Sequence, residues 1–345
     1  MAGVTSKLHK LKEDVRSFYA VAGVKRMHQP SAAEFLREAV SCHQPVIITG
    51  LLDEWEAMEK WADTESFLSR APKEVCVNFT PDGRADAVTH DGYFAKPCEV
   101  KMNTRQFMEM LEDPTEEDAV PYLSRQSDNV RELMPTLLED CSPSINLGDE
   151  SFGTEVEAVN LWVGDARSVS SLHKDFFENF YAVVRGTKTF TLYPPTDVMW
   201  LKSKSYPSAV WERKNGRDDG NSIRSRPQKT DLTLAPEGGG AGVKWIPIDP
   251  LDPSSVARHP DIHIENASPV NISVSAGETL YLPALWLHRV TSTTEDLTVS
   301  VNYWYDMRFD LRYCFYRFAS LLLDDDDDND DDDGDGNDDN DDDND

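Results

Sequence analysis

The sequence lacks the features that mark a secreted or membrane-anchored chain. Residues 1–21 are charged and amphipathic, unlike a signal peptide, and no apolar run approaches the roughly 20 residues that span a bilayer. Cysteines are few, odd in number and widely separated, without a CxxC or other zinc-binding spacing. These absences argue against a disulfide framework and against structural zinc. Free thiols are typical of a reducing compartment, so we expect a soluble protein that is cytoplasmic and nuclear.

Basic residues are also scarce, and the formal net charge is -29. Much of the acidity lies in residues 324–345, which hold 16 aspartates and no lysine or arginine, so that the rest of the chain carries -13. A run of like charges is typical of a solvated segment, and we expect this tail to be disordered. The moderately acidic body argues against nucleic-acid binding and favours a basic protein partner.

Residues 1–150 alternate between helical and strand-like patterns. Apolar residues recur at helical spacing near the N-terminus, and side chains suited to N-capping precede three further helical stretches. We expect a helix over Leu8–Tyr19, a helix from Ser31 toward Cys42, a strand over 45–50, a helix after Asn103 and a helix from Asp128 through Leu138.

The pattern changes to short strands separated by turns over residues 151–307, which predicts an all-β barrel or sandwich. The expected strands cover 156–163, 179–185, 187–193, 270–274, 279–282, 288–291 and 297–304. A polar, glycine-rich and basic segment at 202–241 interrupts them, and we expect it to be a mobile insertion. Residues 308–323 return to a helical pattern, with an apolar stripe.

The strongest chemical signal is a pair of distant histidine segments within this β region. His173 and Asp175 are two residues apart, so on a strand both side chains would point to one face. His288, on a later strand, would complete a face of two histidines and one carboxylate. Such a set leaves three positions of an octahedral metal open, as Fe(II) oxygenases require.

Zinc is the competing metal, because two histidines and an aspartate with an open position also suit a hydrolytic zinc site. No HExxH or HxxEH motif supplies the general base that a zinc hydrolase needs. Lys188 favours iron with 2-oxoglutarate, since the far carboxylate of this co-substrate must be held by a cation and by hydroxyl donors when it is buried. Tyr122 and Ser170 are candidate hydroxyls.

At these residues the chain resembles the jumonji-C (JmjC) family of 2-oxoglutarate oxygenases. The similarity covers roughly residues 10–320 and includes the metal segments and several short flanking motifs. These motifs are Leu172-His173-Lys174-Asp175, Glu178-Asn179, Tyr193-Pro194-Pro195, Trp245-Ile246-Pro247, Asp249-Pro250-Leu251, Leu280 to Trp286 and Tyr305-Asp306-Met307. The long basic insertion and the aspartate tail depart from the family pattern.

The resemblance implies a mainly β fold with helical support at both ends, namely a double-stranded β-helix of the cupin-like, jelly-roll type. Residues 1–150 would pack on the catalytic barrel at 151–307. The resemblance also implies bound Fe(II), with 2-oxoglutarate and O2 as co-substrates. The site residues that it carries over are the iron ligands His173, Asp175 and His288, and the co-substrate and pocket residues Lys188, Tyr122, Ser170, Asn160 and Asn302.

The resemblance is greatest to members that hydroxylate a lysine side chain in proteins. It implies (3S)-lysyl hydroxylation of translation-associated GTPases, the developmentally regulated GTP-binding proteins, with release of succinate and CO2. Three alternatives stay open: histone lysine demethylation, histone-tail cleavage, and a non-enzymatic acidic binding module or chaperone. No recognisable peptidase constellation supports the second of these. Histones and a second copy of the chain remain candidate partners, whereas nucleic acid and membrane are not expected.

Overall fold

The computed structural model describes residues 2–19, 23–214, 226–240, 242–292 and 297–323. The chain forms two compact units, Met1–Arg308 and Phe309–Asp345. The second unit contributes one helix to the described residues, α9 (Leu311–Leu323), in agreement with the predicted C-terminal helix. The acidic tail at 324–345, expected to be disordered, lies outside the described residues. No described helix is long and apolar enough to cross a membrane.

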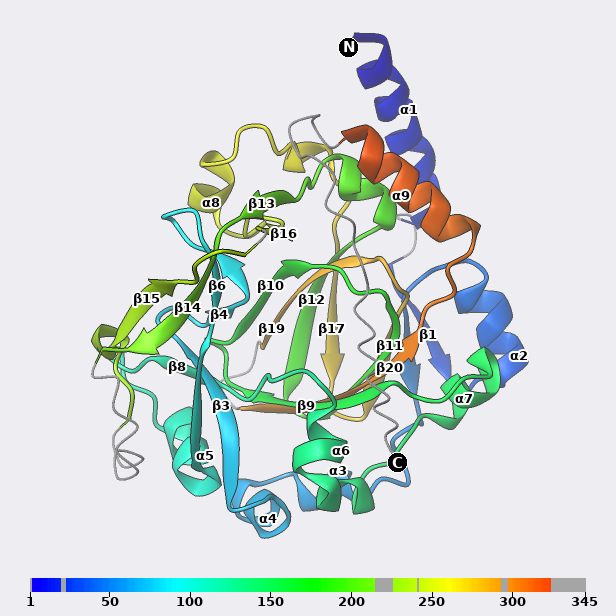
Figure 1. Cartoon of the computed structure of the whole chain (residues 1–345). Helices are drawn as coiled ribbons and strands as arrows, with labels where there is room; N and C mark the ends of the chain where they lie inside the picture. Colours follow the sequence, from blue (N-terminus) through cyan, green and yellow to red (C-terminus); the bar gives the residue numbers. More distant parts are fainter. Residues whose placement is uncertain (1, 20–22, 215–225, 241, 293–296, 324–345) are drawn as a thin grey trace, which may run out of the picture. The chain divides into compact units, whose positions relative to one another are not determined.

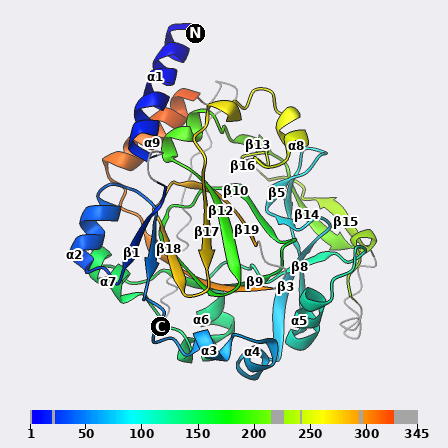
Figure 2. The same cartoon turned by 180° about the vertical axis from the view of Figure 1, so that it is seen from behind.

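Eight strands of the first unit form two sheets between which the chain passes back and forth. Strands β9, β20, β11 and β18 are neighbours in one sheet, and β17, β12, β19 and β10 in the other. Figures 1 and 2 show β10, β12, β17 and β19 side by side from both directions. This arrangement confirms the predicted double-stranded β-helix. The strands are β9 (Ala158–Gly164), β10 (Val169–His173), β11 (Phe177–Arg185), β12 (Thr187–Tyr193), β17 (Val270–Ser275), β18 (Glu278–Leu282), β19 (Leu287–Ser292) and β20 (Thr298–Asp306).

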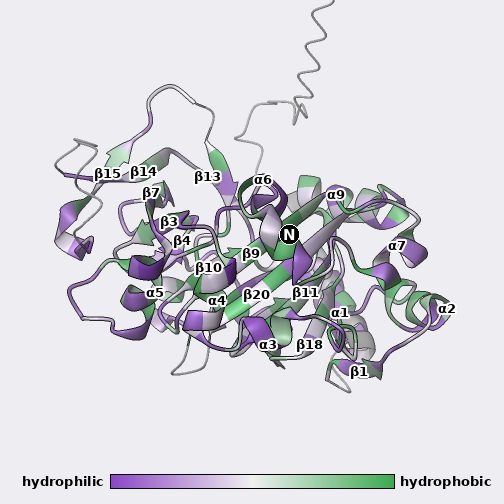
Figure 3. Ribbon diagram, turned by 90° about the horizontal axis from the view of Figure 1, so that it is seen from below, coloured by the Kyte–Doolittle hydropathy of each residue, from purple (hydrophilic) through white to green (hydrophobic). Residues whose placement is uncertain are grey.

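Side chains alternate between the two faces of each strand, and both faces of the first sheet are buried. On β20, Val301 and Tyr303 belong to a large apolar core, whereas Ser300 and Asn302 are buried polar residues on the opposite face. A smaller apolar cluster, which includes Phe190 and Val290, contains residues of both sheets. In Figure 3 hydrophobic colouring runs along β20, whereas hydrophilic colouring is prominent on the peripheral helix α5 (Thr104–Glu112). The polar face of the first sheet therefore points toward the barrel interior.

The N-terminal region adds two strands to this sheet. Strand β2 (Val46–Thr49) pairs antiparallel with β18, and β1 (Lys25–His28) pairs parallel with β2. The predicted N-terminal helix is α1 (Ala2–Tyr19), and the predicted Asn103 cap begins α5. The remaining helices of this unit are α2 (Ala32–Phe35), α3 (Ala57–Lys60), α4 (Thr64–Arg70), α6 (Asn129–Leu133), α7 (Asn146–Phe152) and α8 (Pro253–Ala257), with 3₁₀ turns at Pro195–Met199, Lys229–Asp231 and Ile264–Asn266.

Two predicted helices differ from the expectation. Ser31 caps α2 by accepting a hydrogen bond from the Glu34 amide at 3.3 Å, but the helix continues as a π-helix over Leu36–Val40. The helix expected from Asp128 through Leu138 is wrong in its second half, because α6 ends at Leu133 and a 3₁₀ helix covers Pro135–Glu139. Pro135 has no amide hydrogen to donate, and a proline disfavours helical geometry at the residue before it.

The insertion predicted at 202–241 also differs from the expectation of a mobile segment. Its described residues form three strands, of which two pair with each other and two pair with strands outside the segment. Residues 215–225 and 241 lie outside the described residues. The strands of these outer sheets are β3 (Glu74–Thr80), β4 (Arg84–Ala85), β5 (Ala87–Val88), β6 (Phe94–Lys96), β7 (Cys98–Asn103), β8 (Val120–Tyr122), β13 (Lys204–Tyr206), β14 (Ser208–Arg213), β15 (Leu232–Pro236) and β16 (Val243–Trp245).

A buried carboxylate joins the helices beneath the first sheet. Asp140 accepts hydrogen bonds from Arg70 Nε at 2.8 Å, Lys60 Nζ at 2.9 Å and Trp61 Nε1 at 3.1 Å, and its side chain is fully buried. Burial raises the pKa of the Asp140 carboxyl, but the hydrogen bonds from Arg70, Lys60 and Trp61 outweigh it and lower this pKa overall. The Asp140 carboxylate therefore stabilises the fold at neutral pH.

We expect Asp140→Ala to lower the free energy of unfolding by about 3 kcal/mol, because it leaves the buried indole N–H of Trp61 without an acceptor and leaves Arg70 and Lys60 with only their exposed partners Glu139 and Glu56. The matched control is Glu139→Ala, which removes an exposed carboxylate bonded to the same arginine. It should change stability by less than about 0.5 kcal/mol. Urea unfolding at pH 7 measures both values. The wild-type advantage over Asp140→Ala should shrink as the pH falls below about 4, where the unfolded carboxyl becomes protonated.

Candidate metal centre

Pairing between β10 and β19 places two histidines opposite each other. His173 is the last residue of β10, and its Cα partner across the antiparallel ladder is His288 on β19. The two imidazole ring centroids are 4.2 Å apart. The register shifts between Ser170 and His173, so a local irregularity precedes the histidine pair. Two histidines that are 115 positions apart in the sequence are thus in direct contact across one pair of strands.

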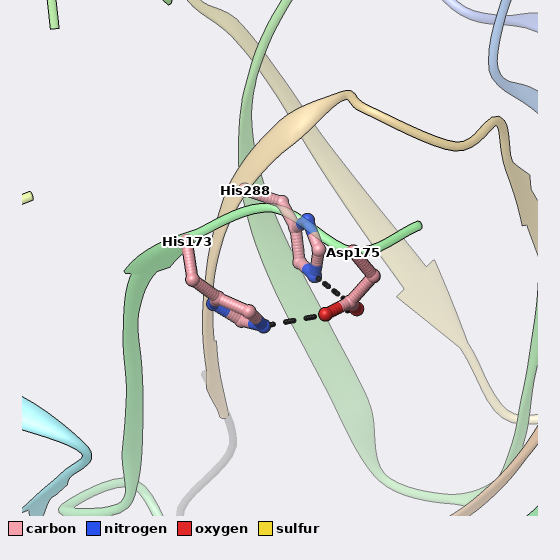
Figure 4. A group of neighbouring side chains, drawn as sticks. All are labelled: His173, Asp175 and His288. Atoms are coloured by element: carbon pink, nitrogen blue, oxygen red, sulfur yellow. Dashed lines mark ion pairs between the residues drawn. The ribbon is translucent and has the colours of Figure 1, made fainter. Parts of the chain in front are cut away.

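Asp175 reaches the same point from a loop. The expectation that His173 and Asp175 share one face of a strand is wrong, because β10 ends at His173 and Asp175 lies in the short connection to β11. The Asp175 Oδ2 atom is nevertheless 3.9 Å from His173 Nε2 and 3.5 Å from His288 Nε2. Figure 4 shows the three side chains converging, with the carboxylate turned toward both rings.

Backbone carbonyls orient both imidazole rings. His173 Nδ1 lies 2.7 Å from the Ser171 carbonyl oxygen, and His288 Nδ1 lies 2.9 Å from the Trp286 carbonyl oxygen. An Nδ1–H donor to each carbonyl leaves the Nε2 lone pair free to bind a metal. Burial, together with the nearby His173, lowers the pKa of His288 to about 4. His288 is therefore neutral at pH 7, the form that ligates a metal.

The donor set fits a metal with open positions. One ligand atom from each of His173, Asp175 and His288 lies within 4.8 Å of the others, and no other such group of histidine, cysteine or acidic residues occurs in the described part of the chain. Two imidazoles and one carboxylate on one face are typical of non-haem Fe(II) sites, although zinc accepts the same donors. The five cysteines are free thiols and take no part in the cluster.

A strained turn supports the cluster from the other side. Leu285 has a φ of 67°, which is rare for a residue other than glycine, and its amide donates to the Asp175 carbonyl oxygen at 2.8 Å. Glu178 Oε2 accepts hydrogen bonds from Tyr281 Oη at 2.7 Å and from the Ala284 amide at 3.4 Å. Left-handed geometry costs a side chain about 1–3 kcal/mol and is concentrated at functional sites. The turn therefore holds the Asp175 loop against the approach to His288.

A buried lysine lies on β12, the strand that pairs with the other edge of β19. Lys188 on β12 pairs with Ser292, four residues beyond His288 on β19 or roughly 13 Å along the strand. Its side chain is 1% exposed, and its ammonium lies 3.4 Å from Tyr122 Oη. Within the described ranges no carboxylate oxygen lies within 4.0 Å of the Lys188 ammonium. Asp165, whose charge acts on Lys188 from farther away, pairs instead with Arg167. Burial lowers the pKa of Lys188 to about 7, a change that Asp165 only partly opposes.

Tyr122 lies beside Lys188, and Ser170 lies beside Tyr122. Burial raises the pKa of the Tyr122 phenol, so this hydroxyl is a neutral donor. A Cβ on Gly164 would come within 2.7 Å of the Tyr122 ring, so the close approach of this ring requires glycine there. Ser170 lines a small cavity beside Tyr122 and another in front of the His173–Asp175–His288 cluster. Hydroxyl donors thus occur near both the lysine and the cluster.

The two predicted asparagines differ in position. Asn302 on β20 lines the cavity with His173 and His288, accepts a hydrogen bond from Trp162 Nε1 at 2.7 Å and donates to Asn179 Oδ1 at 3.2 Å. Asn160, its cross-strand neighbour, is fully buried and is not among the residues that line either cavity. Asn160 Oδ1 accepts from the Asn129 amide at 3.3 Å, so the structure assigns Asn160 a packing contact rather than a place on the cavity wall.

Similarity to known proteins agrees with this geometry. The profile of the cupin-like domain family matches residues 32–311. JmjC domain-containing protein E of Dictyostelium discoideum is 36% identical, over 90% of this chain and 92% of that protein. Lysine-specific demethylase JMJ32 of Arabidopsis thaliana is 35% identical, over 93% of this chain and 92% of its own length. The bifunctional peptidase and (3S)-lysyl hydroxylase JMJD7 of Homo sapiens is 32% identical, over 93% and 96% respectively. This chain belongs to the jumonji-C family.

Jumonji-C oxygenases depend on Fe(II) and 2-oxoglutarate, and this chain is a 2-oxoglutarate-dependent dioxygenase. Sequence reasoning missed several polar and aromatic residues of the cavity walls. Gln126, Asn179 and Tyr181 line the cavity beside the cluster, and Trp245 stacks parallel to the His173 ring with centroids 6.0 Å apart. The i, i+2 alternation of Asn179 and Tyr181 on one strand was an available signal. No pattern within the sequence singles out Gln126.

We expect Asp175→Ala to weaken Mn(II) binding by at least about 100-fold, because it removes one of three ligand atoms, a larger loss than that of an outer partner. Isothermal titration calorimetry on metal-free protein measures the change. Asp306→Asn, at the exposed end of β20, is the matched control and should bind Mn(II) like the wild type. Equal Mn(II) affinity in Asp175→Ala and wild type would show that the cluster is not the metal site.

Proposed function

We propose that this jumonji-C protein is an Fe(II)- and 2-oxoglutarate-dependent protein lysyl hydroxylase. The observation that carries the proposal is a two-histidine, one-carboxylate cluster together with the buried Lys188, which has no carboxylate partner in the described residues and lies on β12, the other neighbour of β19. The cluster supplies metal ligands, and the lysine supplies a cation for a dicarboxylate. A zinc hydrolase has no use for a buried ammonium of this kind, so iron with 2-oxoglutarate explains both features together.

The residues of the site have separate roles in this proposal. When bound, Fe(II) with 2-oxoglutarate and O2 would supply the oxidising power to replace a C–H bond of the substrate by C–OH, with release of succinate and CO2. His173, Asp175 and His288 would hold the metal from one side and leave the opposite side to the two co-substrates. The ammonium of Lys188 and the hydroxyl of Tyr122 would hold the far carboxylate of 2-oxoglutarate. Ser170, close to Tyr122, would orient the same molecule.

The proposal that lysine is the target residue rests on the names of similar proteins. JMJD7 of Homo sapiens, which shares almost its whole length with this chain, is named a (3S)-lysyl hydroxylase. By the resemblance, the developmentally regulated GTP-binding proteins are the protein partners that we propose. Lysine demethylation is the second candidate, because JMJ32 of Arabidopsis thaliana is named a lysine-specific demethylase at similar identity and coverage. Both reactions begin with hydroxylation of a C–H bond. In demethylation the carbon is an N-methyl carbon, and the hydroxymethyl product then releases formaldehyde as its C–N bond breaks.

Mass spectrometry of the product distinguishes these functions. We expect a developmentally regulated GTP-binding protein, incubated with the enzyme, Fe(II), 2-oxoglutarate and O2, to gain one oxygen on a lysine. Succinate should form in equal amount. His288→Ala should produce neither product, because it removes a metal ligand, whereas His263→Ala, an exposed histidine elsewhere on the surface, should behave like the wild type.

Loss of a methyl group from methyl-lysine histone peptides, with no oxygen gained on the GTPase, would favour the demethylase instead. New peptide termini that form without 2-oxoglutarate would favour the peptidase named for the human relative. If His288→Ala kept hydroxylase or demethylase activity, the cluster could not be the metal site for that reaction.

The lowered pKa of Lys188 predicts how co-substrate binding depends on pH. Only the ammonium form attracts a carboxylate, and with a pKa of about 7 the free lysine is largely neutral at pH 8.5. Binding above pH 7 must then take up a proton, so the dissociation constant of 2-oxoglutarate should rise by up to about tenfold per pH unit. Calorimetry with Mn(II) in place of iron measures this constant without turnover. Lys188→Met should bind 2-oxoglutarate weakly at every pH. If the dissociation constant of this variant depended on pH as steeply as that of the wild type, the role of Lys188 would be contradicted.

A further inference from the structure

A carboxylate that has no part in the metal cluster lies close to it. Asp86 stands between β4, which pairs with β10 at Val169 and Ser170, and β5, which belongs to an outer sheet. It is therefore the residue at which the chain leaves the catalytic barrel. A Cβ on Gly83 would come within 1.9 Å of the Arg167 carbonyl oxygen, so only glycine there lets this segment approach the barrel so closely. Asp86 itself has a left-handed φ of 51°, which aspartate tolerates better than most residues.

The Asp86 carboxylate has no cationic partner in the described residues. It lines the small cavity that also contains His173, Ser170 and Tyr122. No lysine, arginine or histidine nitrogen of the described ranges lies within 4.0 Å of it, and the ammonium of nearby Lys96 pairs with Glu237 at 3.0 Å. Burial raises the pKa of the Asp86 carboxyl, and the charges of His173 and Lys96 only partly oppose this change. A part-buried acid in this state would be stabilised by a cation from outside the chain.

Aromatic rings form the other walls of the cavity. Trp162 and Trp245 both line it, and Trp245 stacks on the His173 ring. Trp245 Nε1 donates to Ser171 Oγ at 3.1 Å, and Ser171 Oγ donates in turn to the Asp86 carbonyl oxygen. These two bonds fix the backbone of Asp86 relative to the cluster. A carboxylate in a cavity lined by two tryptophans suits an ammonium group, which gains both an ion pair and cation–π attraction.

We propose that Asp86 binds the side-chain ammonium of the substrate lysine and so selects lysine for oxidation. This inference rests on the proposed lysyl hydroxylation. The site then has two charged ends of opposite sign. Lys188 lies deep in the barrel and suits the anionic co-substrate, whereas Asp86 lies where the outer sheet begins and suits a cationic residue that enters from solvent. The His173–Asp175–His288 cluster is part of neither charged end in this proposal, because its ligand atoms hold the metal.

The test compares a lysyl with a norleucyl peptide pool, which differ only in the ammonium group. Each pool has the form acetyl-Xaa-Xaa-Lys-Xaa-Xaa-amide or its norleucine equivalent. Binding is measured without oxygen on protein loaded with Mn(II) and 2-oxoglutarate, and hydroxylation is measured separately with Fe(II) and air. Asp86→Asn is the test variant because asparagine keeps the shape and tolerates the left-handed backbone. The control is Asp91→Asn, an exposed carboxylate five positions along the same segment.

We expect the wild type and Asp91→Asn to bind the lysyl pool at least tenfold more tightly than the norleucyl pool. Asp86→Asn should bind both pools about equally, with a higher KM for lysyl substrates and an unchanged melting temperature. Equal affinity for the two pools in the wild type, or a full lysyl preference in Asp86→Asn, would overturn the role of Asp86. A lysyl preference that depends on Asp86, without any oxygen gained on lysine, would support the binding site and refute the proposed hydroxylation.

Discussion

The antiparallel pairing of β10 with β19 is the constraint on which the rest of the site depends. It sets His173 opposite His288, and a shift of this register by one residue would turn one of the two rings to the other face of the sheet. The irregularity before His173 and the short loop to β11 then bring Asp175 to the same point. Because β12 pairs with the other edge of β19, the same ladder also fixes how far Lys188 lies from the histidines. Metal cluster and co-substrate cation are thus parts of one hydrogen-bonded sheet.

A polar interior inside the barrel is stable because its groups satisfy one another. Asn302 bonds to Trp162 and Asn179, and Ser300 Oγ donates to Tyr181 Oη at 2.8 Å. The apolar core lies instead on the outer face of the first sheet, where the N-terminal helices cover it. Because the apolar outer face of the first sheet must be covered, the barrel needs the 150 residues that precede it. Lys188 and Asp86 are left without an oppositely charged partner within 4.0 Å among the described residues, which is the basis of the proposed binding roles.

The sequence predicted much of the fold, because alternating patterns and turn residues mark short strands clearly. The strands that hold Lys188 and His288 were expected close to their observed bounds, whereas β10, which ends at His173, was not among the expected strands. The differences have physical causes: Pro135 ends a helical pattern, and strand pairing orders the described parts of a segment whose polar composition suggested mobility. The pairing of β14 with β6 spans more than 100 residues, so no local pattern could reveal it. The same holds for Asp86, whose proximity to His173 arises from the pairing of β4 with β10 across more than 80 residues.

The central claim is that one metal at the His173–Asp175–His288 cluster and the ammonium of Lys188 bind the same molecule of 2-oxoglutarate. The direct measurement is calorimetric titration of 2-oxoglutarate with and without saturating Mn(II), in the wild type and in Asp175→Ala. If 2-oxoglutarate binds the metal directly, each ligand tightens the binding of the other, and by linkage the two effects are equal in size. The account predicts that Mn(II) tightens 2-oxoglutarate binding at least tenfold in the wild type and has no effect in Asp175→Ala. Equal 2-oxoglutarate affinity in the wild type with and without metal would contradict it.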